Sequence, residues 1–428
     1  MAPLSTLEIN LNSIAHNLSV VRDACAVEND DNSAPPVQVC AVLKAGAYGL
    51  GASRIANRLE IAGVDMIAVF AADEARALLT SVVRTPLLVL SPMRDLERGD
   101  ALYRAATTGR LHLTVHDAEQ LDALIWLADR FGLILPLHVE INSGMSRGGV
   151  AISDADRVLQ RIADRRRLRL AGLSTQFACA DSDAAFTDDQ ASRFFDFVDE
   201  VDHLIPDDCL LHAANSFAVF RSADHHLDMV RVGLALYGFA AEEMTSVEDT
   251  GLLDHARRLE PAVRWTTSIV HVANIREGQR VGYGAAWRAP RDARVALAPV
   301  GYADGYPLSV AGAASVRIRA EDDSREWHEA PVVGRVSMDQ MTIDVTDLPE
   351  EIVRIGAEVE IVGCDRDAPT HLPTLARAAG TVSHQFMCGI GPRVKRVYKA
   401  AEGADPAALY TTIPASRGSL TSLGAQAR

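Results

Sequence analysis

The chain has 428 residues, of which 48% are hydrophobic and 23% charged, and its formal net charge is −15. This length exceeds the usual size of one domain, so we expect two, and the composition is ordinary for a soluble globular protein. The negative charge argues against nucleic acid or an anionic membrane surface as a partner. The sequence has neither an apolar run that could span a membrane nor a basic and apolar leader, so we expect a cytoplasmic protein.

No residue pattern predicts a metal site. The pair His225-His226 lacks partners at metal-ligand spacing and is expected in a solvated turn. The cysteines are widely scattered and form no CxxC pair, which is typical of small buried side chains in a reducing compartment. They are Cys25, Cys40, Cys179, Cys209, Cys364 and Cys388.

The first half of the chain alternates short apolar strands with amphipathic helices. A half-buried strand is expected over residues 7–11, then a helix with Ser13 as its N-cap that runs to about residue 25, and a surface loop over 26–36. Strands are expected over 37–43, 66–70, 86–90, 111–115, 135–141, 168–174, 209–213 and 230–236, with helices over 72–82, 118–130, 154–165 and 189–204. Eight such repeats favour a closed (β/α)8 TIM-type barrel over a doubly wound open sheet, because no glycine fingerprint follows the first strand.

The pattern changes near Pro261. Beyond it, strand-like runs cover 262–272, 295–300, 315–319, 341–345 and 358–362, with one helical stretch at 373–379. We therefore predict a barrel over 12–255 and a mostly-β domain over 256–401, which the N-terminal strand 6–11 joins. The polar tail 402–428 is expected to be flexible.

Lys44 ends the apolar strand 37–43 and is followed by glycines and Tyr48. A lysine at the end of a buried strand is costly to keep as an ammonium, so it tends to be neutral or covalently engaged. An isolated lysine could simply extend its amine to solvent. The neighbouring glycines and tyrosine favour a phosphate-bearing cofactor held as a Schiff base.

The other barrel strands also end in polar residues. Because a barrel enzyme carries its site at the carboxyl ends of its strands, these residues are expected at one mouth. They are Arg147 after the fifth strand, Gln176 after the sixth, His212 and Ser216 at the seventh, and Arg231, Gly233 and Leu234 at the eighth. Arginine suits carboxylate and phosphate groups because its planar fork donates two parallel hydrogen bonds.

Five motifs resemble those of the barrel-type alanine racemases, which use pyridoxal phosphate. They are Lys44-Ala-Gly-Ala-Tyr-Gly, Met229-Val-Arg-Val-Gly-Leu-Ala-Leu-Tyr-Gly, Val281-Gly-Tyr283-Gly, Gly301-Tyr302-Ala-Asp-Gly-Tyr-Pro and Val333-Gly-Arg-Val-Ser-Met338-Asp339. The resemblance extends from about Leu7 to Tyr398 and crosses both expected domains. It implies a homodimer with shared active sites, acting on a small amino acid.

The resemblance also implies roles. Lys44 would hold the cofactor and move the Cα proton on one face, and Tyr302 from the other subunit would act on the opposite face, with Tyr306 as the rival tyrosine. Racemisation needs two such groups because the planar carbanion must regain its proton from the other side. The remaining implied roles are Arg231 at the pyridine nitrogen supported by His212, Tyr48, Ser216, Gly233, Leu234 and His384 at the phosphate, Arg147 and Met338 at the substrate carboxylate, and Tyr283 and Asp339 in support.

Four positions depart from the family pattern. Glu140 replaces a lysine that many members carbamylate to pair with the substrate-binding arginine, and Gln176 replaces a histidine packed on the cofactor ring. His384 replaces a tyrosine near phosphate and substrate, and Gly46 replaces an asparagine. We expect Glu140 to serve as the ready-made anion for Arg147. The changes at Gln176 and His384 predict extra room, and hence some activity on serine as well as alanine.

Two other functions remain open at this point. A lyase or decarboxylase of the same architecture is disfavoured because such decarboxylases usually place an acidic residue, not an arginine, at the pyridine nitrogen. A non-enzymatic carrier of pyridoxal phosphate is disfavoured by the β domain with Tyr302 and Met338.

Overall fold

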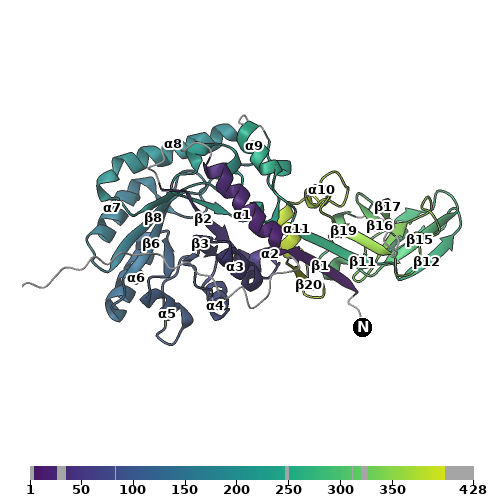
Figure 1. The fold of residues 1–428 in the computed structure, drawn as a ribbon, viewed down its shortest axis with the longest axis horizontal. Coiled ribbons are helices and arrows are strands. Elements are labelled where there is room, and N and C mark those ends of the chain that lie inside the picture. The colour runs from purple at the N-terminus through teal and green to yellow at the C-terminus, as the bar shows by residue number, and fades with distance from the viewer. Residues whose placement is uncertain are drawn as a thin grey trace, which may run out of the picture.

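The computed structural model describes residues 4–26, 35–81, 83–245, 250–310, 312–319 and 326–400. The expected tail, 402–428, and most of the loop expected over 26–36 lie outside these residues. Figure 1 shows a barrel ringed by helices, and beside it an extended domain made mainly of strands. Within the described residues, no helix combines the length and the apolar character needed to cross a bilayer.

Eight parallel strands form the barrel, which confirms the expected fold class. They pair in the order β10-β2-β3-β4-β5-β6-β8-β9. Between β9 and β10 the seam is held by single bonds, because the Asp228 N–H donates to the Leu211 carbonyl at 3.0 Å and the Arg231 N–H to Ala214 at 2.9 Å. The barrel is thus nearly closed. Its strands are β2 (Gln38–Val42), β3 (Met66–Val69), β4 (Leu87–Val89), β5 (Leu111–Val115), β6 (Leu135–Asn142), β8 (Leu168–Ser174), β9 (Leu210–His212) and β10 (Met229–Val232), and β7 (Val150–Ala151) pairs with β6.

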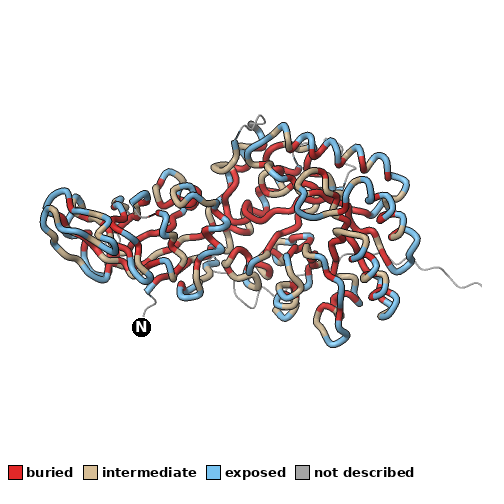
Figure 2. Tube along the Cα trace, turned by 180° about the vertical axis from the view of Figure 1, so that it is seen from behind, coloured by how far each residue is buried: buried red, intermediate tan, exposed pale blue. Residues whose placement is uncertain are grey.

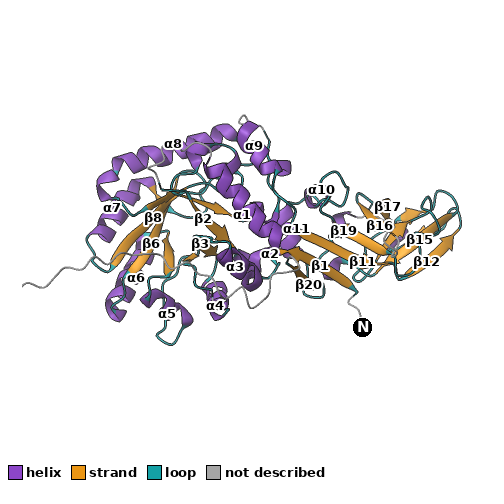
Figure 3. Cartoon of the chain, in the orientation of Figure 1, coloured by secondary structure: helices purple, strands orange, loops and turns teal. Residues whose placement is uncertain are grey.

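Helices cover the outside of the barrel (Figure 3). Most of them bury an apolar face towards the barrel, and several begin at an aspartate whose carboxylate accepts a free N–H of the first turn. Asp117 accepts from Gln120 at 2.6 Å and Asp183 from Phe186 at 3.0 Å. The helices are α1 (Leu11–Ala26), α3 (Ala52–Ile61), α4 (Ala72–Thr80), α5 (Ala101–Thr107), α6 (Ala118–Phe131), α7 (Ile152–Ala163), α8 (Ala184–Glu200) and α9 (Thr250–Arg257).

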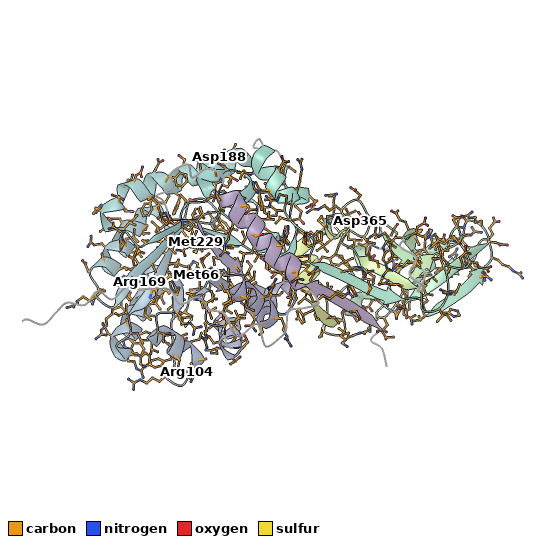
Figure 4. All side chains as sticks on the ribbon, in the orientation of Figure 1. Met66, Arg104, Arg169, Asp188, Met229 and Asp365 are labelled. Carbon is orange, nitrogen blue, oxygen red and sulfur yellow. The ribbon has the colours of Figure 1, made fainter. Side chains whose placement is uncertain are left out.

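The inside of the barrel is divided into an apolar half and a polar half. Side chains alternate between the two faces of a strand, so every second residue points inward. On β2, β3, β4 and β10 the inner side chains form a small apolar cluster of Cys40, Val42, Met66, Ala68, Leu88 and Met229. Figure 4 labels Met66 and Met229, which lie on the strands that flank β2. Histidines and other polar residues occupy the inside of β5, β6 and β9.

The second domain is built on one nine-stranded sheet in the order β12-β15-β18-β17-β16-β19-β11-β1-β20. The N-terminal strand β1 lies between β11 and β20, so both ends of the described chain are joined in this sheet. The strands are β1 (Ser5–Asn10), β11 (Val263–Ser268), β12 (His271–Ile275), β15 (Ala293–Ala298), β16 (Ser315–Arg319), β17 (His328–Val333), β18 (Met341–Asp344), β19 (Glu358–Val362) and β20 (Lys395–Lys399), with a separate hairpin of β13 (Arg280–Val281) and β14 (Trp287–Arg288). We propose 12–255 and 256–401 as the two domains.

Short helices complete the fold. The α-helices are α2 (Lys44–Tyr48), α10 (Leu372–Ala378) and α11 (Ser383–Gly389). The 3-10 helices are η1 (Asp202–Leu204), η2 (Ala218–Phe220), η3 (Ala223–His225), η4 (Leu234–Tyr237), η5 (Ala241–Glu243), η6 (Tyr283–Ala285), η7 (Tyr302–Asp304) and η8 (Leu308–Val310). Figure 2 shows buried backbone continuing from the barrel into the β domain, which indicates that the two share a packed junction.

Several local expectations were wrong. Asn10, not Ser13, caps α1, because its Oδ1 accepts the N–H groups of Asn12 and Ser13 at 3.0 and 3.3 Å. The strand expected over 230–236 ends at Val232, since Gly233 leaves the extended conformation before η4. The run 262–272 is two strands, and α11 was not expected at all.

Two expectations about surface and core were also wrong. His225 and His226 are buried, and the His226 ring hydrogen-bonds to the Val219 carbonyl at 2.8 Å, so this pair is not a solvated turn. Cys364 and Cys388 are exposed, although Cys25, Cys40 and Cys209 are buried as expected. In the part of the chain that the structure describes, no group of three His, Cys, Asp or Glu residues is placed to hold a metal ion.

Candidate active site

A cavity of about 200 Å³ opens at the carboxyl ends of the barrel strands. It gathers side chains from seven of the eight barrel strands or the loops that follow them, and from α11 of the second domain. Eleven of the residues singled out in the sequence line it: Lys44, Tyr48, Glu140, Arg147, Gln176, His212, Ser216, Arg231, Gly233, Leu234 and His384. The remaining lining residues are Val42, Leu88, Leu90, Thr114, Ser174, Asn215 and Phe217.

Lys44 begins a left-handed turn. Ala45, Gly46, Ala47 and Tyr48 have φ values of 54°, 64°, 59° and 59°. This region costs a non-glycine residue about 1–2 kcal/mol, so the surrounding structure must hold the turn in place. Glu74 on α4 contributes by accepting the Ala45 N–H at 2.5 Å. The turn brings Lys44 and Tyr48 to the same cavity, four residues apart.

The environment of Lys44 favours its neutral amine. Burial is the main cause that lowers its pKa, and the positive charge of Arg147 adds to the effect. The local electrostatics therefore agree with the prediction that Lys44, at the end of a buried strand, is neutral or covalently engaged.

Arg231 is buried at the cavity floor and most of its donors are engaged. Its Nη1 donates to His212 Nδ1 and to the His212 carbonyl, both at 2.7 Å. Its Nη2 donates to the carbonyls of Thr175 at 2.7 Å and Ala213 at 3.2 Å, and to Gln176 Oε1 at 3.2 Å. These bonds fix the guanidinium and leave the Nε–H as its remaining donor. Burial lowers the pKa of Arg231, and the charge of Glu140 opposes that effect.

Ser216, Gly233 and Tyr48 form another part of the cavity wall. The Ser216 hydroxyl oxygen accepts the N–H groups of Gly233 at 2.9 Å and Ala235 at 3.2 Å. A Cβ at position 233 would lie 2.1 Å from Tyr48 Oη, so only glycine leaves space for this hydroxyl. The Tyr48 ring packs edge-on to Tyr237 with 5.3 Å between ring centroids, and burial raises its pKa. The result is a compact cradle of hydroxyl and amide groups.

Arg147 lies on an exposed loop after β6. Asn142 shapes this loop by accepting the N–H groups of Gly144 at 3.2 Å and Ser146 at 2.9 Å. Within the described residues, Arg147 and Glu140 form no ion pair with each other. The nearest ionisable nitrogen to the Glu140 carboxylate is His116 Nδ1, which lies 4.0 Å from Glu140 Oε2. His116 Nδ1 accepts the Gly149 N–H at 3.2 Å and therefore carries no proton, so this approach is not a salt bridge either.

His384 reaches the cavity from the second domain because α11 packs against α2. Its pKa is lowered, first by burial and also by the charge of Lys44, while Glu243 opposes the shift.

Four of the residues to which the resemblance assigns a role at the site do not line this cavity. Tyr302, Met338 and Tyr283 are 42%, 52% and 72% exposed on the β domain. Backbone bonds hold the first two together, because the Tyr302 N–H donates to Ser337 at 3.1 Å and the Ala303 N–H to Met338 at 3.0 Å. Arg393 forms ion pairs with both Asp339 and Asp304, at 2.7 and 3.1 Å, and Asp304 belongs to the same short helix η7 as Tyr302. We call Tyr283, Tyr302, Met338 and Asp339 the β-domain cluster.

Comparison with known proteins places both halves of the chain in one family. Family models for the N-terminal and C-terminal domains of alanine racemase match residues 9–241 and 262–398. The chain belongs to the alanine racemase family. An alanine racemase from Sorangium cellulosum is 34% identical over 404 residues, which is 92% of this chain and 98% of that protein. Another from Halothermothrix orenii is 30% identical over 393 residues, covering 92% and 96%.

The fold agrees with the family. The crystal structure of the alanine racemase from the D-cycloserine producer Streptomyces lavendulae superposes with a TM-score of 0.78 at 26% identity, covering 94% of this chain and 98% of that one. The protein is therefore an isomerase of the amino-acid racemase class, as expected from its motifs.

The structure explains the departure at Gly46 and changes the interpretation of the departure at Gln176. Gly46 has φ +64°, a conformation that glycine and asparagine both tolerate, so glycine fits this turn without backbone strain. Gln176 does not simply leave a gap, because its Oε1 accepts a hydrogen bond from Arg231.

The sequence analysis missed Glu74, His116 and His138. Each forms a hydrogen bond either with a residue that lines the cavity or with the backbone of a segment that carries such a residue. His138 gave a usable signal, since a histidine within the apolar run Leu-Pro-Leu-His-Val of a barrel strand must face the interior or a helix. The roles of Glu74 and His116 depend on contacts between distant segments and had no local signal.

Proposed function

We propose that this protein interconverts L- and D-alanine with pyridoxal phosphate, by a two-base mechanism shared between the subunits of a cytoplasmic homodimer. The observation that carries the proposal is one cavity that combines a lysine of lowered pKa, a buried arginine and a hydroxyl-amide cradle. When bound, pyridoxal phosphate stabilises the negative charge left on Cα after its proton is removed.

The residues present fit this cofactor. Lys44 Nζ would hold it covalently, and the cradle of Tyr48, Ser216 and Gly233 would receive its phosphate, with Leu234 and His384 beside it. The Ser216 oxygen already accepts two N–H groups, so its own proton is suited to a phosphate oxygen. Arg231 would donate its Nε–H to the pyridine nitrogen. A guanidinium hardly ever gives up its proton, so Arg231 would donate a hydrogen bond without protonating the pyridine nitrogen. The ring would then withdraw less negative charge from Cα.

The two protons are handled on opposite faces of Cα. Lys44 Nζ would remove or deliver the proton on one face, which its lowered pKa favours. Tyr302 of the partner subunit would act on the other face. Tyr306 is unsuited because it is fully buried between Trp265 and Phe386, whereas Tyr302 is exposed. Arg147 and the backbone near Met338 would bind the substrate carboxylate, with Tyr283 and Asp339 in support.

Chiral analysis after incubation with single L-amino acids tests the activity. Loss of chirality from L-alanine supports the proposal, whereas a decarboxylated or eliminated product indicates a lyase, and no turnover indicates a carrier.

Borohydride reduction and peptide mapping should place the cofactor mass on the peptide with Lys44. Lys44→Ala should lose the visible absorbance of the bound cofactor. A label on another lysine would contradict the site.

We also propose turnover of serine. His384 is shorter than the family tyrosine and lines the cavity near Lys44, which leaves room and a polar partner beside the substrate's β carbon. A pocket with spare room discriminates weakly, since one methylene is worth only about 1–3 kcal/mol. The specificity constant for serine relative to alanine should therefore fall in His384→Tyr. Equal ratios in the wild type and the variant would mean that His384 has not opened the pocket.

A further inference from the structure

Three buried histidines extend from Arg231 across the inside of the barrel. His212 Nδ1 lies 2.7 Å from Arg231 Nη1, and His212 Nε2 lies 2.8 Å from His138 Nδ1. His138 Nε2 in turn lies 2.9 Å from His112 Nδ1, and the His112 ring bonds to the backbone of Gly109. The three rings are 1%, 0% and 7% exposed. They come from β9, β6 and β5, so the row leads from the cavity towards the amino-terminal end of the barrel.

The guanidinium fixes the direction of every bond in this row. Arginine can only donate, so His212 Nδ1 must carry no proton and its Nε2 must carry one. That Nε2–H donates to His138 Nδ1, and the same logic puts the proton of His138 on Nε2. His112 then accepts at Nδ1 and donates to the Gly109 carbonyl. Reversing any one imidazole would set two N–H groups against each other and carry the conflict back to Arg231.

The row stays neutral because its members are buried. Burial lowers the pKa of His112 to about 4 and the pKa values of His138 and His212 well below the ordinary value. Within the described residues Arg231 makes no ion pair, so its charge is compensated mainly by oriented neutral acceptors. Hydrogen bonds in such a row polarise one another, so His212 Nδ1 becomes a stronger acceptor for Arg231.

Gly172 makes the row possible. The side chain of His138 on β6 must cross β8 to reach His212 on β9. Gly172 is the β8 residue in its path, and a Cβ there would lie 2.2 Å from His138 Nδ1. The glycine does not have a positive φ, so its backbone alone would accept alanine. Glycine at this position is therefore explained by the space that the His138 ring occupies.

We propose that His138 and His112, with the gap at Gly172, are positioning residues that act through His212 to orient Arg231 for the cofactor. The proposal rests on the proposed function, because Arg231 is useful in this orientation only if it meets a cofactor ring. Neither histidine reaches the cavity itself, so neither is expected to contact the substrate.

Two pairs of variants of the full-length holoenzyme test the proposal. His112→Met replaces the imidazole acceptor of His138 by a thioether that accepts only weakly and cannot donate, while His112→Gln keeps one acceptor and one donor in the same direction. Gly172→Ala displaces His138 although all three histidines remain, and Gly99→Ala adds a methyl group in open space as a control. The readouts are the imidazole ¹⁵N spectrum, which reports the tautomer of each histidine, and the kinetics of alanine racemisation.

We expect wild type, His112→Gln and Gly99→Ala to show His212 with its proton on Nε2. Arg231 should keep this tautomer in His112→Met and Gly172→Ala as well. In His112→Met the ¹⁵N shift of His138 Nε2, and in Gly172→Ala that of His212 Nε2, should instead move to the value of an N–H group without an imidazole acceptor. The kcat of both variants should fall about ten-fold, as for one hydrogen bond to a charged group, with KM for alanine within about two-fold. Circular dichroism checks folding, and if His112→Met does not fold, the single added methyl of Gly172→Ala carries the test.

Two results would overturn the proposal. One is that the ¹⁵N shifts of His138 and His212 and the value of kcat are all unchanged in His112→Met and Gly172→Ala. The other is a loss in His112→Gln as large as in His112→Met, which would mean that volume matters and direction does not. If wild type does not racemise alanine, the proposed function fails, while the ¹⁵N spectra still decide whether the row is directional.

Discussion

At the scale of single residues, the departures from the family pattern fall into two groups. Gly46 preserves a backbone conformation, whereas Glu140, Gln176 and His384 change the groups that line the cavity. Glu140 is the most informative of them. It provides a negative charge without carbamylation, but it lies beside His116, and its charge opposes the lowering of the Arg231 pKa by burial.

Glu140→Gln should raise KM for alanine by about three-fold. The effect is modest because Arg147 is exposed and charges near solvent are screened. Wild-type activity should not depend on added bicarbonate, since Glu140 needs no carbon dioxide to become an anion. Steady-state kinetics with and without bicarbonate measure both. Unchanged KM and kcat in Glu140→Gln would show that the carboxylate is dispensable, and a fall in kcat alone would indicate action through Arg231.

At the scale of elements, the barrel interior combines stability with positioning. Strands β2, β3 and β4 fill one side with apolar side chains, and β5, β6 and β9 fill the other with neutral histidines. A buried neutral histidine stabilises the fold only while it is unprotonated, so the polar half makes the fold sensitive to acid.

The free energy of unfolding should therefore fall as the pH drops from about 6.5 to 4. His112 has a folded pKa of about 4 and an ordinary value of 6.5, so within this range the unfolded chain binds more protons. This residue alone should account for a loss of about 3 kcal/mol. Urea unfolding at a series of pH values should give a shallower fall in His112→Gln. Identical pH dependence in both proteins would contradict the burial argument.

At the scale of the whole molecule, the second domain completes the site from two sides. Arg396 and Tyr398 on β20 bind the carbonyls of Gly49 and Leu50, at 3.1 and 2.8 Å, and so hold the turn that follows Lys44. The α11 helix brings His384 to the cavity. The β-domain cluster remains exposed and separate from this cavity, which supports the proposal that it serves the site of a partner subunit.

Mixing inactive Lys44→Ala and Tyr302→Phe subunits should restore about a quarter of the wild-type activity. After full exchange half of the dimers are mixed, and each mixed dimer has one intact site of two. Exchange can be confirmed by mass spectrometry of differently tagged subunits. Absence of recovery after confirmed exchange would mean that Lys44 and Tyr302 of one chain act together.

The barrel, the mostly-β domain and the family could all be predicted from the amino-acid sequence. Strand periodicity is local, so the spans 111–115, 168–174, 315–319 and 358–362 were predicted with the bounds that the structure has. The rule that barrel sites lie at strand ends was enough to gather Lys44, Arg147 and Arg231 at one cavity.

The way in which these residues are held could not be predicted from local sequence. The N-cap at Asn10, the proximity of Glu140 to His116 and the contact of α11 with α2 all depend on where separate segments meet. The row of histidines is the clearest case, because His138 reaches His212 only across a glycine on the strand between them. A single strand gives the face on which a side chain lies, but the partner across the barrel is fixed by the register of neighbouring strands and by the space that they leave.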